Sequence, residues 1–423
     1  MSVRDARSAE LYDRACKVLV GGVNSPVRAM RAIGRDPIFI DRASGAYVWD
    51  VDGNKYVDYL ASWGPAVLGH GPQVVLDALR GALPRGTSFG APTEREVIFA
   101  EAVRDAVPSI ERLRMTSSGS EAVMGALRVA RAATGRDPIV KTIGGYHGAI
   151  DGLLAEAGSG ATTLGVPTSP GVPAGATAAT RLVAYNDLAA AEAALEGAAA
   201  MIIEPVAGNM GVVAPEPGYL AGLRAACDRT GALLIFDEVI TGFRIARGGA
   251  QERFGVTADL VCYGKIIGGG LPVGAFGGRA DVMKVLAPDG PCYQAGTLSG
   301  NPLATTAGLA VLRELADPGV YDTLEAQGAA LELAFRAADV PVQINRIGSM
   351  LTPFFTDRAV TDYASATASD TDHYGRFARA LLAHGVYPPP SQYEAWFVGT
   401  THSTQDLAWT TVALAAAGEA SDA

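Results

Sequence analysis

The chain has 423 residues, a formal net charge of −10 and a hydrophobic fraction of 49%. This length supports two or more domains whose cores can exclude water from an active site, which excludes a small binding module. The negative charge argues against nucleic acid and anionic membranes as partners, and charged residues interrupt every apolar stretch before it reaches the roughly 18 to 20 residues that span a bilayer.

The N-terminal residues predict an amphipathic helix. Charged and apolar residues alternate over Ala9–Val18, unlike the apolar core of a signal peptide, so we expect a cytoplasmic protein. The cysteines form no Cys-x-x-Cys pair. Their spacing favours buried thiols over disulfides or a metal site at Cys16, Cys227, Cys262 and Cys292.

A small antiparallel element is predicted next. Apolar residues alternate over Pro37–Ile40 and Ala46–Asp50, and Lys55–Leu60 returns after the turn signal Asp52-Gly53. From about residue 65 to 300 the pattern changes to short apolar strands separated by helical stretches, with strands near 139–143, 201–206, 233–237 and 260–263. This alternation predicts an α/β domain with a mostly parallel sheet covered on both faces.

The C-terminal part predicts a second, α+β lobe that the N-terminal hairpin joins. Two long helical patterns follow Asn301-Pro302, then two strand candidates between 341 and 356 and a closing helix near 403–417. We expect a large domain over 65–301 and a small domain built from 1–64 and 302–423.

The segment 157–180 has no charge after Glu156 and little apolar bulk. It is predicted to form no regular element. A loop of this length is typical either of a lid over a site or of an ordinary surface loop.

Three predicted strands end in residues that carry chemistry: Glu204, Asp237 and Lys265. Open α/β sheets bind ligands at this edge. A lysine at the end of an apolar run, ahead of the glycines 268–270, can hold its amine in a pocket and form a Schiff base. An aspartate can keep the ring nitrogen of pyridoxal phosphate protonated. The alternatives are a surface role for Lys265 and, for Asp237, the capping of a turn or a pairing with Arg244.

Residues 116–121 open a predicted helix. Ser118 and Glu121 have the spacing of a capping box, while Gly119, Ser120 and the helix N-terminus could cradle a phosphate. Tyr146 is placed to stack on a ring at the same edge. The neighbouring His147 is a hydrogen-bonded support or, as the weaker alternative, a proton-transfer group.

Two glycine-rich stretches complete the candidates. Residues 293–302 lead into a helix, and residues 21–28 end in Arg28, which can grip a carboxylate with two hydrogen bonds. A lone arginine in a loop is more often structural, so its role stays open here.

Together these motifs resemble the class III aminotransferase group of fold-type I pyridoxal phosphate enzymes. Within that group the chain is similar to the aminomutases that act on glutamate-1-semialdehyde. The general likeness rests on residues 118–120, 204–205, 237–239 and 264–270. The aminomutase likeness rests on residues 21–28, 61–65, 86–93, 204–211, 294–302 and 390–395.

The resemblance implies a role for each matching residue. Lys265 would bind the cofactor covalently, Asp237 would bind its pyridinium nitrogen, Asn209 would lie by its phenolic side and Tyr146 would stack on it. The phosphate would bind at Gly119 and Ser120, with Thr297 reaching in from the partner subunit of a homodimer, and Ser118 and Gly296 would also bind the cofactor. The substrate pocket would be shaped by Ser25, Arg28, Trp63 and Glu394, and residues 157–180 match the gating loop.

Two departures from the family pattern stand out. Ser117-Ser118-Gly119-Ser120 replaces the usual Asn-Ser-Gly-Thr, which keeps the hydroxyl for the phosphate. Tyr146-His147-Gly148-Ala149 replaces Tyr-His-Gly-His, so any role of the second histidine is absent.

The implied reaction converts (S)-4-amino-5-oxopentanoate into 5-aminolevulinate for tetrapyrrole synthesis, with pyridoxal phosphate cycling with pyridoxamine phosphate and no external amino donor. One alternative is a donor-dependent transaminase for a β- or ω-amino acid. The other is a non-catalytic pyridoxal phosphate-binding protein, which the pairing of Lys265 with Asp237 and the lack of a basic segment argue against.

Overall fold

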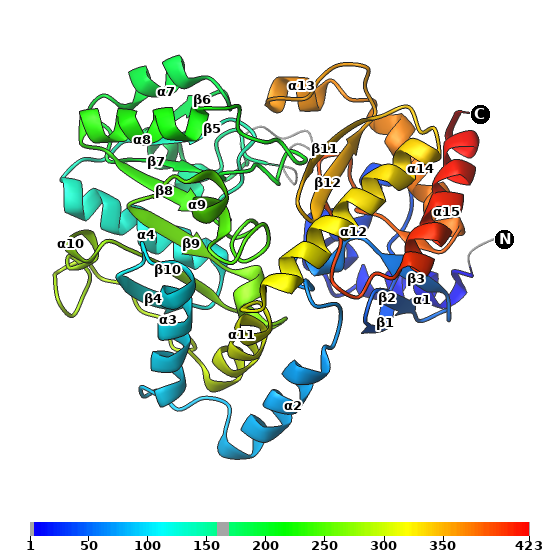
Figure 1. The fold of residues 1–423 in the computed structure, drawn as a ribbon, viewed down its shortest axis with the longest axis horizontal. Coiled ribbons are helices and arrows are strands. Elements are labelled where there is room, and N and C mark those ends of the chain that lie inside the picture. Colours follow the sequence, from blue (N-terminus) through cyan, green and yellow to red (C-terminus); the bar gives the residue numbers. More distant parts are fainter. Residues whose placement is uncertain (1–3, 159–168, 423) are drawn as a thin grey trace.

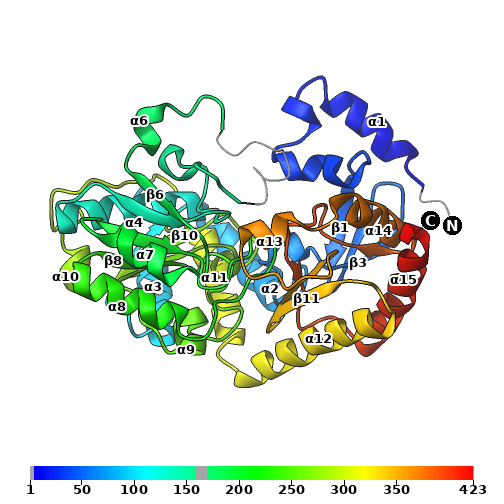
Figure 2. The same ribbon diagram turned by 90° about the horizontal axis from the view of Figure 1, so that it is seen from above.

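The computed structural model describes residues 4–158 and 169–422. The chain forms two lobes that lie side by side (Figures 1 and 2), and the labelled N- and C-terminal ends both belong to the second lobe. The helix α12 (Pro318–Ala337) connects them, because Leu324 packs in the core of the first lobe and Leu331 and Phe335 pack in the core of the second.

A seven-stranded sheet organises the first lobe. Its order is β4-β10-β9-β8-β7-β5-β6, and β10 alone runs antiparallel to its neighbours among the described strands. The strands are β4 (Arg112–Thr116), β5 (Ile139–Thr142), β6 (Thr180–Val183), β7 (Ala200–Ile203), β8 (Leu233–Asp237), β9 (Leu260–Tyr263) and β10 (Gly274–Gly278). The expected mostly parallel sheet is therefore confirmed.

Both faces of this sheet are buried. In β8, Leu234 and Phe236 belong to one hydrophobic core and Ile235 to another on the opposite face, as the alternation of side chains along a strand requires. One face is covered by α3 (Glu94–Ala106), α7 (Leu188–Leu195), α8 (Tyr219–Thr230) and α11 (Pro302–Glu314), and the other by α4 (Gly119–Thr134) and α10 (Ala280–Met283). Buried strands of this kind are near-continuous apolar runs, which explains why β5 and β7–β9 were recognisable.

Three strands of the sheet were not predicted, namely β4, β6 and β10. Arginines interrupt β4 and β6. Three of the five residues of β10 are glycines, and a side-chain carbon at Gly274 or Gly278 would lie 2.1 or 2.0 Å from a neighbouring carbonyl oxygen. The backbones thus approach closely at β10, which removes the apolar side chains that would mark a strand.

The second lobe joins the two ends of the chain. Its four-stranded sheet, ordered β1-β2-β3-β13, comprises β1 (Ile40–Ser44), β2 (Tyr47–Asp50), β3 (Lys55–Asp58) and β13 (Val386–Tyr387). A three-stranded sheet comprises β11 (Gln343–Ile347), β12 (Met350–Phe354) and β14 (Trp396–Phe397). Its remaining helices are α1 (Ala6–Ala15), α13 (Tyr363–Thr367), α14 (Thr371–Ala383) and α15 (Thr404–Asp422).

Two expectations for this lobe need correction. The first strand, expected at Pro37–Ile40, begins only at Ile40, and the sheet is not purely antiparallel because β13 pairs with β3 in parallel. The boundaries after residues 64 and 301 stay a prediction; α11 packs against α3 and α2 (Gln73–Ala82) of the first lobe, which favours a boundary after α11.

Short helical turns connect these elements. They are η1 (Val20–Gly22), η2 (Pro26–Ala29), η3 (Arg31–Ile33), η4 (Ala61–Trp63), η5 (Leu83–Arg85), η6 (Asp151–Leu153), α6 (Ala174–Thr177), α9 (Gly249–Phe254) and η7 (Lys265–Gly268). Segment 157–180 is expected to contain no regular element, but residues 174–177 form the helical turn α6 and Thr180 begins β6. Its residues 159–168 lie outside the described residues, so the lid stays a prediction.

Cys227, Cys262 and Cys292 are buried as expected, whereas Cys16 is exposed. Of the helices in residues 4–158 and 169–422, none has the length and apolar character needed to cross a membrane.

The turn that carries Lys265 rests on α11. A side-chain carbon at Gly308 of α11 would lie 2.1 Å from the carbonyl oxygen of Ile267 and 2.7 Å from the ring of Phe99. Glycine is therefore required there for η7 to approach the helix.

We predict that Gly308→Ala lowers the free energy of unfolding by about 1–3 kcal/mol, since neither backbone can give way cheaply. Gly81→Ala is the matched control, because no atom lies within 4 Å of its added carbon and alanine favours a helix by about 0.5–1 kcal/mol. Thermal and urea unfolding of both variants check this. A Gly308→Ala protein as stable as the Gly81→Ala protein would contradict it.

Candidate active site

The carboxyl ends of three neighbouring parallel strands meet at one cavity. Glu204 follows β7, Asp237 ends β8 and Lys265 follows β9, as the sequence predicted. The cavity has a volume of about 230 Å³ and is lined by Gly119, Ser120, Val123, Tyr146, His147, Gly148, Glu204, Asn209, Asp237, Val239, Ile240 and Lys265.

Asp237 is held by two partners. Its Oδ2 lies 2.7 Å from Nδ1 of the buried His147, and its Oδ1 accepts a hydrogen bond of 3.1 Å from the N–H of Val239. Of the two alternatives for Asp237, the turn cap is present in the bond from Val239, and the pairing with Arg244 is not found. Such a histidine fixes the orientation of the carboxylate, which agrees with the support role considered for His147.

Glu204 organises the opposite wall of the cavity. Its Oε1 accepts from Nδ2 of Asn209 at 2.6 Å and from the N–H of Gly208 at 3.2 Å, and its Oε2 accepts from the N–H of Tyr146 at 3.3 Å. Burial raises the pKa of Glu204 to about 7, with His147 lowering it and Asp237 raising it. Glu204 was recognised as a strand-end acid but not as a site residue, although the strand-end position was the signal for it.

The Lys265 amine lies among opposing charges. Burial lowers the pKa of Lys265, while the charges of Asp237, Glu204 and Glu394 raise it. Its φ is +49°, in the left-handed region that costs a non-glycine residue about 1–3 kcal/mol. A lowered pKa increases the fraction of neutral, nucleophilic amine at a given pH.

The N-terminus of α4 faces the same cavity. Ser118 caps the helix by accepting from the N–H of Glu121 at 3.2 Å, but Glu121 accepts from Ser117 at 2.6 Å, so the capping box does not close on Ser118. A side-chain carbon at Gly148 would lie 2.4 Å from Oγ of Ser120. Gly119, Ser120 and Gly148 thus leave a polar hollow at the positive end of a helix dipole.

A strained turn borders Lys265. The successive residues Ala61, Ser62 and Trp63 have φ of 47°, 57° and 68°. Asp58 accepts from the N–H of Leu60 at 2.8 Å and of Ala61 at 3.2 Å, and it lies 2.6 Å from Nε2 of His70.

Arg244 secures the far end of this turn. Its guanidinium donates to the carbonyl of Gly64, to Oγ of Ser349 at 3.0 Å and to the carbonyl of Val398 at 3.3 Å. A side-chain carbon at Gly64 would lie 3.7 Å from Cδ of Lys265, so this turn forms a wall next to the amine.

The residues expected to shape a substrate pocket are not all in the cavity. Arg28 and Trp63 line a second cavity of about 490 Å³ between the N-terminal segment and the second lobe. Ser25 is half-buried and lies in neither lining, and Glu394 is buried within electrostatic reach of Lys265. Gly296 and Thr297 are exposed and contribute nothing to the cavity of their own chain.

The cavity suits pyridoxal phosphate in shape and chemistry. It offers an amine at Lys265, a carboxylate oriented by His147, the ring of Tyr146 and a glycine-lined hollow at the start of α4. Over residues 4–158 and 169–422, no cluster of histidine, cysteine and acidic side chains could hold a metal ion.

The chain is similar to known enzymes over nearly its whole length. It is 58% identical over 410 residues to glutamate-1-semialdehyde 2,1-aminomutase of Pelotomaculum thermopropionicum, covering 95% of this chain and 94% of the relative. It is 56% identical to the protein of the same name in Sorangium cellulosum, covering 96% of this chain and 94% of the relative.

Solved structures share the fold. An omega-transaminase from Sphaerobacter thermophilus superposes with a TM-score of 0.90 at 34% identity, with 98% of each chain covered. A glutamate-1-semialdehyde-aminomutase from Pseudomonas aeruginosa in complex with PMP superposes with a TM-score of 0.86 at 28% identity, covering 97% of this chain and 94% of that one.

The family model for aminotransferase class-III matches residues 30–392, which include every lining residue of the Lys265 cavity. With the strand-end Glu204, Asp237 and Lys265 in place, the chain belongs to the class-III aminotransferase family of fold-type I enzymes.

Proposed function

We infer that this chain converts glutamate-1-semialdehyde, (S)-4-amino-5-oxopentanoate, into 5-aminolevulinate by intramolecular amino transfer that depends on pyridoxal phosphate. This isomerase reaction feeds tetrapyrrole synthesis. The observation that carries the inference is identity above 50% over nearly the whole chain to relatives that bear the aminomutase name, combined with the Asp237–Lys265 cavity.

When bound, the cofactor supplies a carbonyl that takes up an amino group and a ring that accepts electrons. Lys265 would attach to it and afterwards move the proton between carbon atoms, since its amine is the basic group at the cavity. Asp237, fixed by His147, would keep the ring nitrogen protonated. Tyr146, Asn209 and the start of α4 would hold the ring and the phosphate.

The substrate carboxylate is assigned by this proposal to Arg28, at the second cavity. Arg28 and Trp63 line that cavity. Trp63 also belongs to the strained turn Ala61–Trp63, and the next residue, Gly64, lies beside Lys265. The turn therefore connects the carboxylate site with the amine, while Ser25 and Glu394 would shape the space between them.

We predict that Lys265→Ala removes the visible absorbance of covalently bound cofactor and nearly all turnover, because no other amine lines the cavity. Asp237→Asn should bind cofactor but react at least tenfold more slowly, since a hydrogen bond to a charged group contributes about 1.5–3 kcal/mol. Lys284→Ala, on the exposed end of α10, is the control. Full activity of either site variant would refute the assignment.

The competing function is a donor-dependent transaminase, which the likeness to an omega-transaminase and to a β-phenylalanine aminotransferase from Variovorax paradoxus keeps open. A mutase returns the amino group to its own substrate, whereas a transaminase needs a second amino acid.

We therefore expect purified enzyme loaded with pyridoxamine phosphate to form 5-aminolevulinate from the semialdehyde alone over many turnovers. Product can be followed by chromatography, with and without alanine or glutamate as donor. A transaminase would instead release 4,5-diaminovalerate, limited to one equivalent per site without a donor and rising further only with one, and would form no sustained 5-aminolevulinate; that outcome would establish the transaminase.

The proposal includes a homodimer in the cytoplasm. Thr297, exposed here, would complete the phosphate site of the partner, and nearby apolar side chains Leu83, Phe89, Val97 and Leu298 are each more than half exposed. The three buried thiols fit a reducing compartment.

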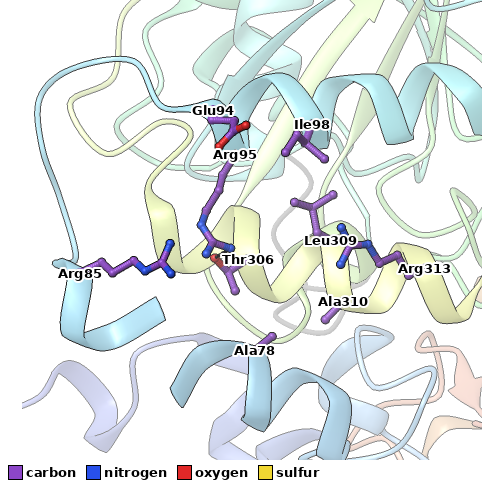
Figure 3. A pocket seen from close by; sticks show the side chains of 9 residues that line it. All are labelled: Ala78, Arg85, Glu94, Arg95, Ile98, Thr306, Leu309, Ala310 and Arg313. Atoms are coloured by element: carbon purple, nitrogen blue, oxygen red, sulfur yellow. Dashed lines mark hydrogen bonds between the residues drawn. The ribbon is translucent and has the colours of Figure 1, made fainter. Parts of the chain in front are cut away.

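An arginine-lined cavity supports the same interface. Arg85 and Arg95 point their guanidinium groups toward Thr306, with Arg313 on the same helix, around a cavity of about 240 Å³ (Figure 3). Arg80 of α2 pairs with Asp77, but no ion pair within the described residues involves these three arginines. The three guanidinium groups outnumber the one carboxylate in the lining, that of Glu94, so the cavity favours a further carboxylate, which a partner subunit can provide.

We predict that Leu298→Asp shifts the protein from dimer to monomer and weakens cofactor retention, because it places a charge in an apolar contact. Val412→Asp, at a residue of α15 in the other lobe that is 65% exposed against 52% for Leu298, should leave the dimer intact (Figure 1). Light scattering combined with cofactor absorbance measures both effects. A wild-type monomer that carries a full complement of cofactor would exclude the shared site.

A further inference from the structure

A buried lysine next to the active site has no role in the function described so far. Lys141 belongs to β5, all four residues of which are buried, and its own exposed fraction is 0%. Lysine is almost never fully buried without a partner, because its ammonium loses the hydration that stabilises the charge. The position of Lys141 therefore requires a compensating interaction.

Three backbone carbonyls provide that interaction. The Lys141 ammonium donates to the carbonyl oxygens of Gly145 at 2.9 Å, Leu153 at 3.1 Å and Ala155 at 3.0 Å. An ammonium has three N–H donors, so all of them are used. No ion pair within the described ranges includes Lys141, and its bonds are to the main chain.

These carbonyls belong to the two sides of one loop, residues 144–158. Gly145 lies on the outgoing leg, which leaves β5, and Leu153 and Ala155 lie on the returning leg, which ends at Gly158. After β5 the chain leaves the sheet at Gly145, carries Tyr146 and His147 past the cavity, turns through η6 and returns through Ala155. The N–H of Gly144 donates to the carbonyl of Glu156 at 2.9 Å, and this hydrogen bond joins the two ends of the loop. Lys141 thus links the outgoing leg to the returning leg from within.

The returning leg ends against two cavity residues. A side-chain carbon at Gly158 would lie 2.4 Å from Cβ of Tyr146 and 3.3 Å from Cβ of Asn209. A shift of the returning leg would therefore move the Tyr146 ring and press on Asn209. Apolar packing restrains this region weakly, since Leu153 is the only large apolar side chain fully buried between Gly144 and Gly158.

The charge of Lys141 is also coupled to the site. Burial lowers the pKa of Lys141 to about 8, and the charges of Glu204 and Glu156 oppose this shift. Glu204 is the acid that orients Asn209 and the Tyr146 backbone. The charge of Glu204 therefore favours the ammonium form of Lys141, which is the form that donates to all three carbonyls.

We propose that Lys141 is a positioning residue of the active site: its ammonium ties the carbonyl of Gly145 to those of Leu153 and Ala155, and thereby fixes Tyr146 and Gly158 beside Asn209. The catalytic meaning of this tie rests on the proposed function, whereas the tie itself is a property of the fold.

The test compares Lys141→Met and Lys141→Gln with Arg136→Met in the cofactor-loaded protein. Methionine keeps the apolar stem and leaves three carbonyls without donors, while glutamine keeps two N–H donors on a shorter side chain. Arg136 is the control, since its guanidinium also donates to two backbone carbonyls, those of Ala198 just before β7 and of Thr230 at the end of α8, and it lies outside the lining of the Lys265 cavity.

Hydrogen exchange followed by mass spectrometry is the first measurement. Lys141→Met should speed exchange of amides 144–158 at least tenfold and leave α8 and β11–β12 unchanged, with a smaller effect in Lys141→Gln. Arg136→Met should speed exchange near residues 198 and 230 only. Unchanged exchange over 144–158, or a uniform increase along the whole chain, would overturn the proposal.

Cofactor absorbance and steady-state kinetics form the second measurement. Lys141→Met should alter the position or intensity of the bound-cofactor band and lower kcat at least tenfold, whereas Arg136→Met should keep both even if its melting midpoint falls equally. Wild-type kcat and spectrum in Lys141→Met would overturn the positioning role, as would failure of both Lys141 variants to fold.

The two inferences fail separately. If the wild-type protein makes no 5-aminolevulinate but Lys141→Met loosens 144–158 and changes the cofactor band, the proposed reaction is wrong and the positioning role stands.

Discussion

The structure depends on keeping one amine among carboxylates at the edge of a largely buried sheet. Burial of Lys265 disfavours its charge, while Asp237, Glu204 and Glu394 favour it, so its pKa reflects a balance between desolvation and Coulomb attraction. The backbone is arranged to hold that balance: Lys265 has a left-handed φ, and η7 rests on Gly308 of α11. Rigid neighbours are necessary because a small displacement in a low dielectric changes such interactions strongly.

Two other buried cations near the cavity are stabilised by neutral groups instead of carboxylates. Lys141 and Arg244 donate to backbone carbonyls and a serine hydroxyl, and neither forms an ion pair in the part of the chain that the structure describes. Burial lowers the pKa of Arg244 to about 9. Carbonyl dipoles stabilise a cation without adding a negative charge. The full carboxylates of Glu204 and Asp237 are thereby left to the cavity and to the hydrogen bonds that shape it.

The sequence predicts the strands best where both faces of the sheet are buried. β7 and β9 are continuous apolar runs, and β5 and β8 are interrupted only by Lys141, Thr142 and the terminal Asp237. The residues at the ends of these strands fall together because parallel strands share one carboxyl edge. β10 escaped recognition because close backbone approach replaces its side chains with glycine. The hydrogen bond between His147 and Asp237 joins residues 90 positions apart, which no local pattern reports. The stretch 21–28 left the role of Arg28 open, and only the resemblance assigned roles to Arg28 and Thr297. Thr297 is exposed and lies outside the cavity of its own chain, and both roles remain predictions.

The second lobe has a consequence for how the protein is made. β3 near residue 57 pairs with β13 near residue 386, and Phe397 of β14 donates to the carbonyl of Tyr59, so the first strands to leave the ribosome wait for almost the last. At about 5–20 residues per second, that wait is on the order of 20 to 70 s. During this time Tyr56 and Tyr59 have no core to enter, while the sheet of the first lobe, complete once β10 emerges, has all its strands available. We therefore expect the first lobe to fold before the second, with strands β1–β3 exposed to aggregation until β13 and β14 are made.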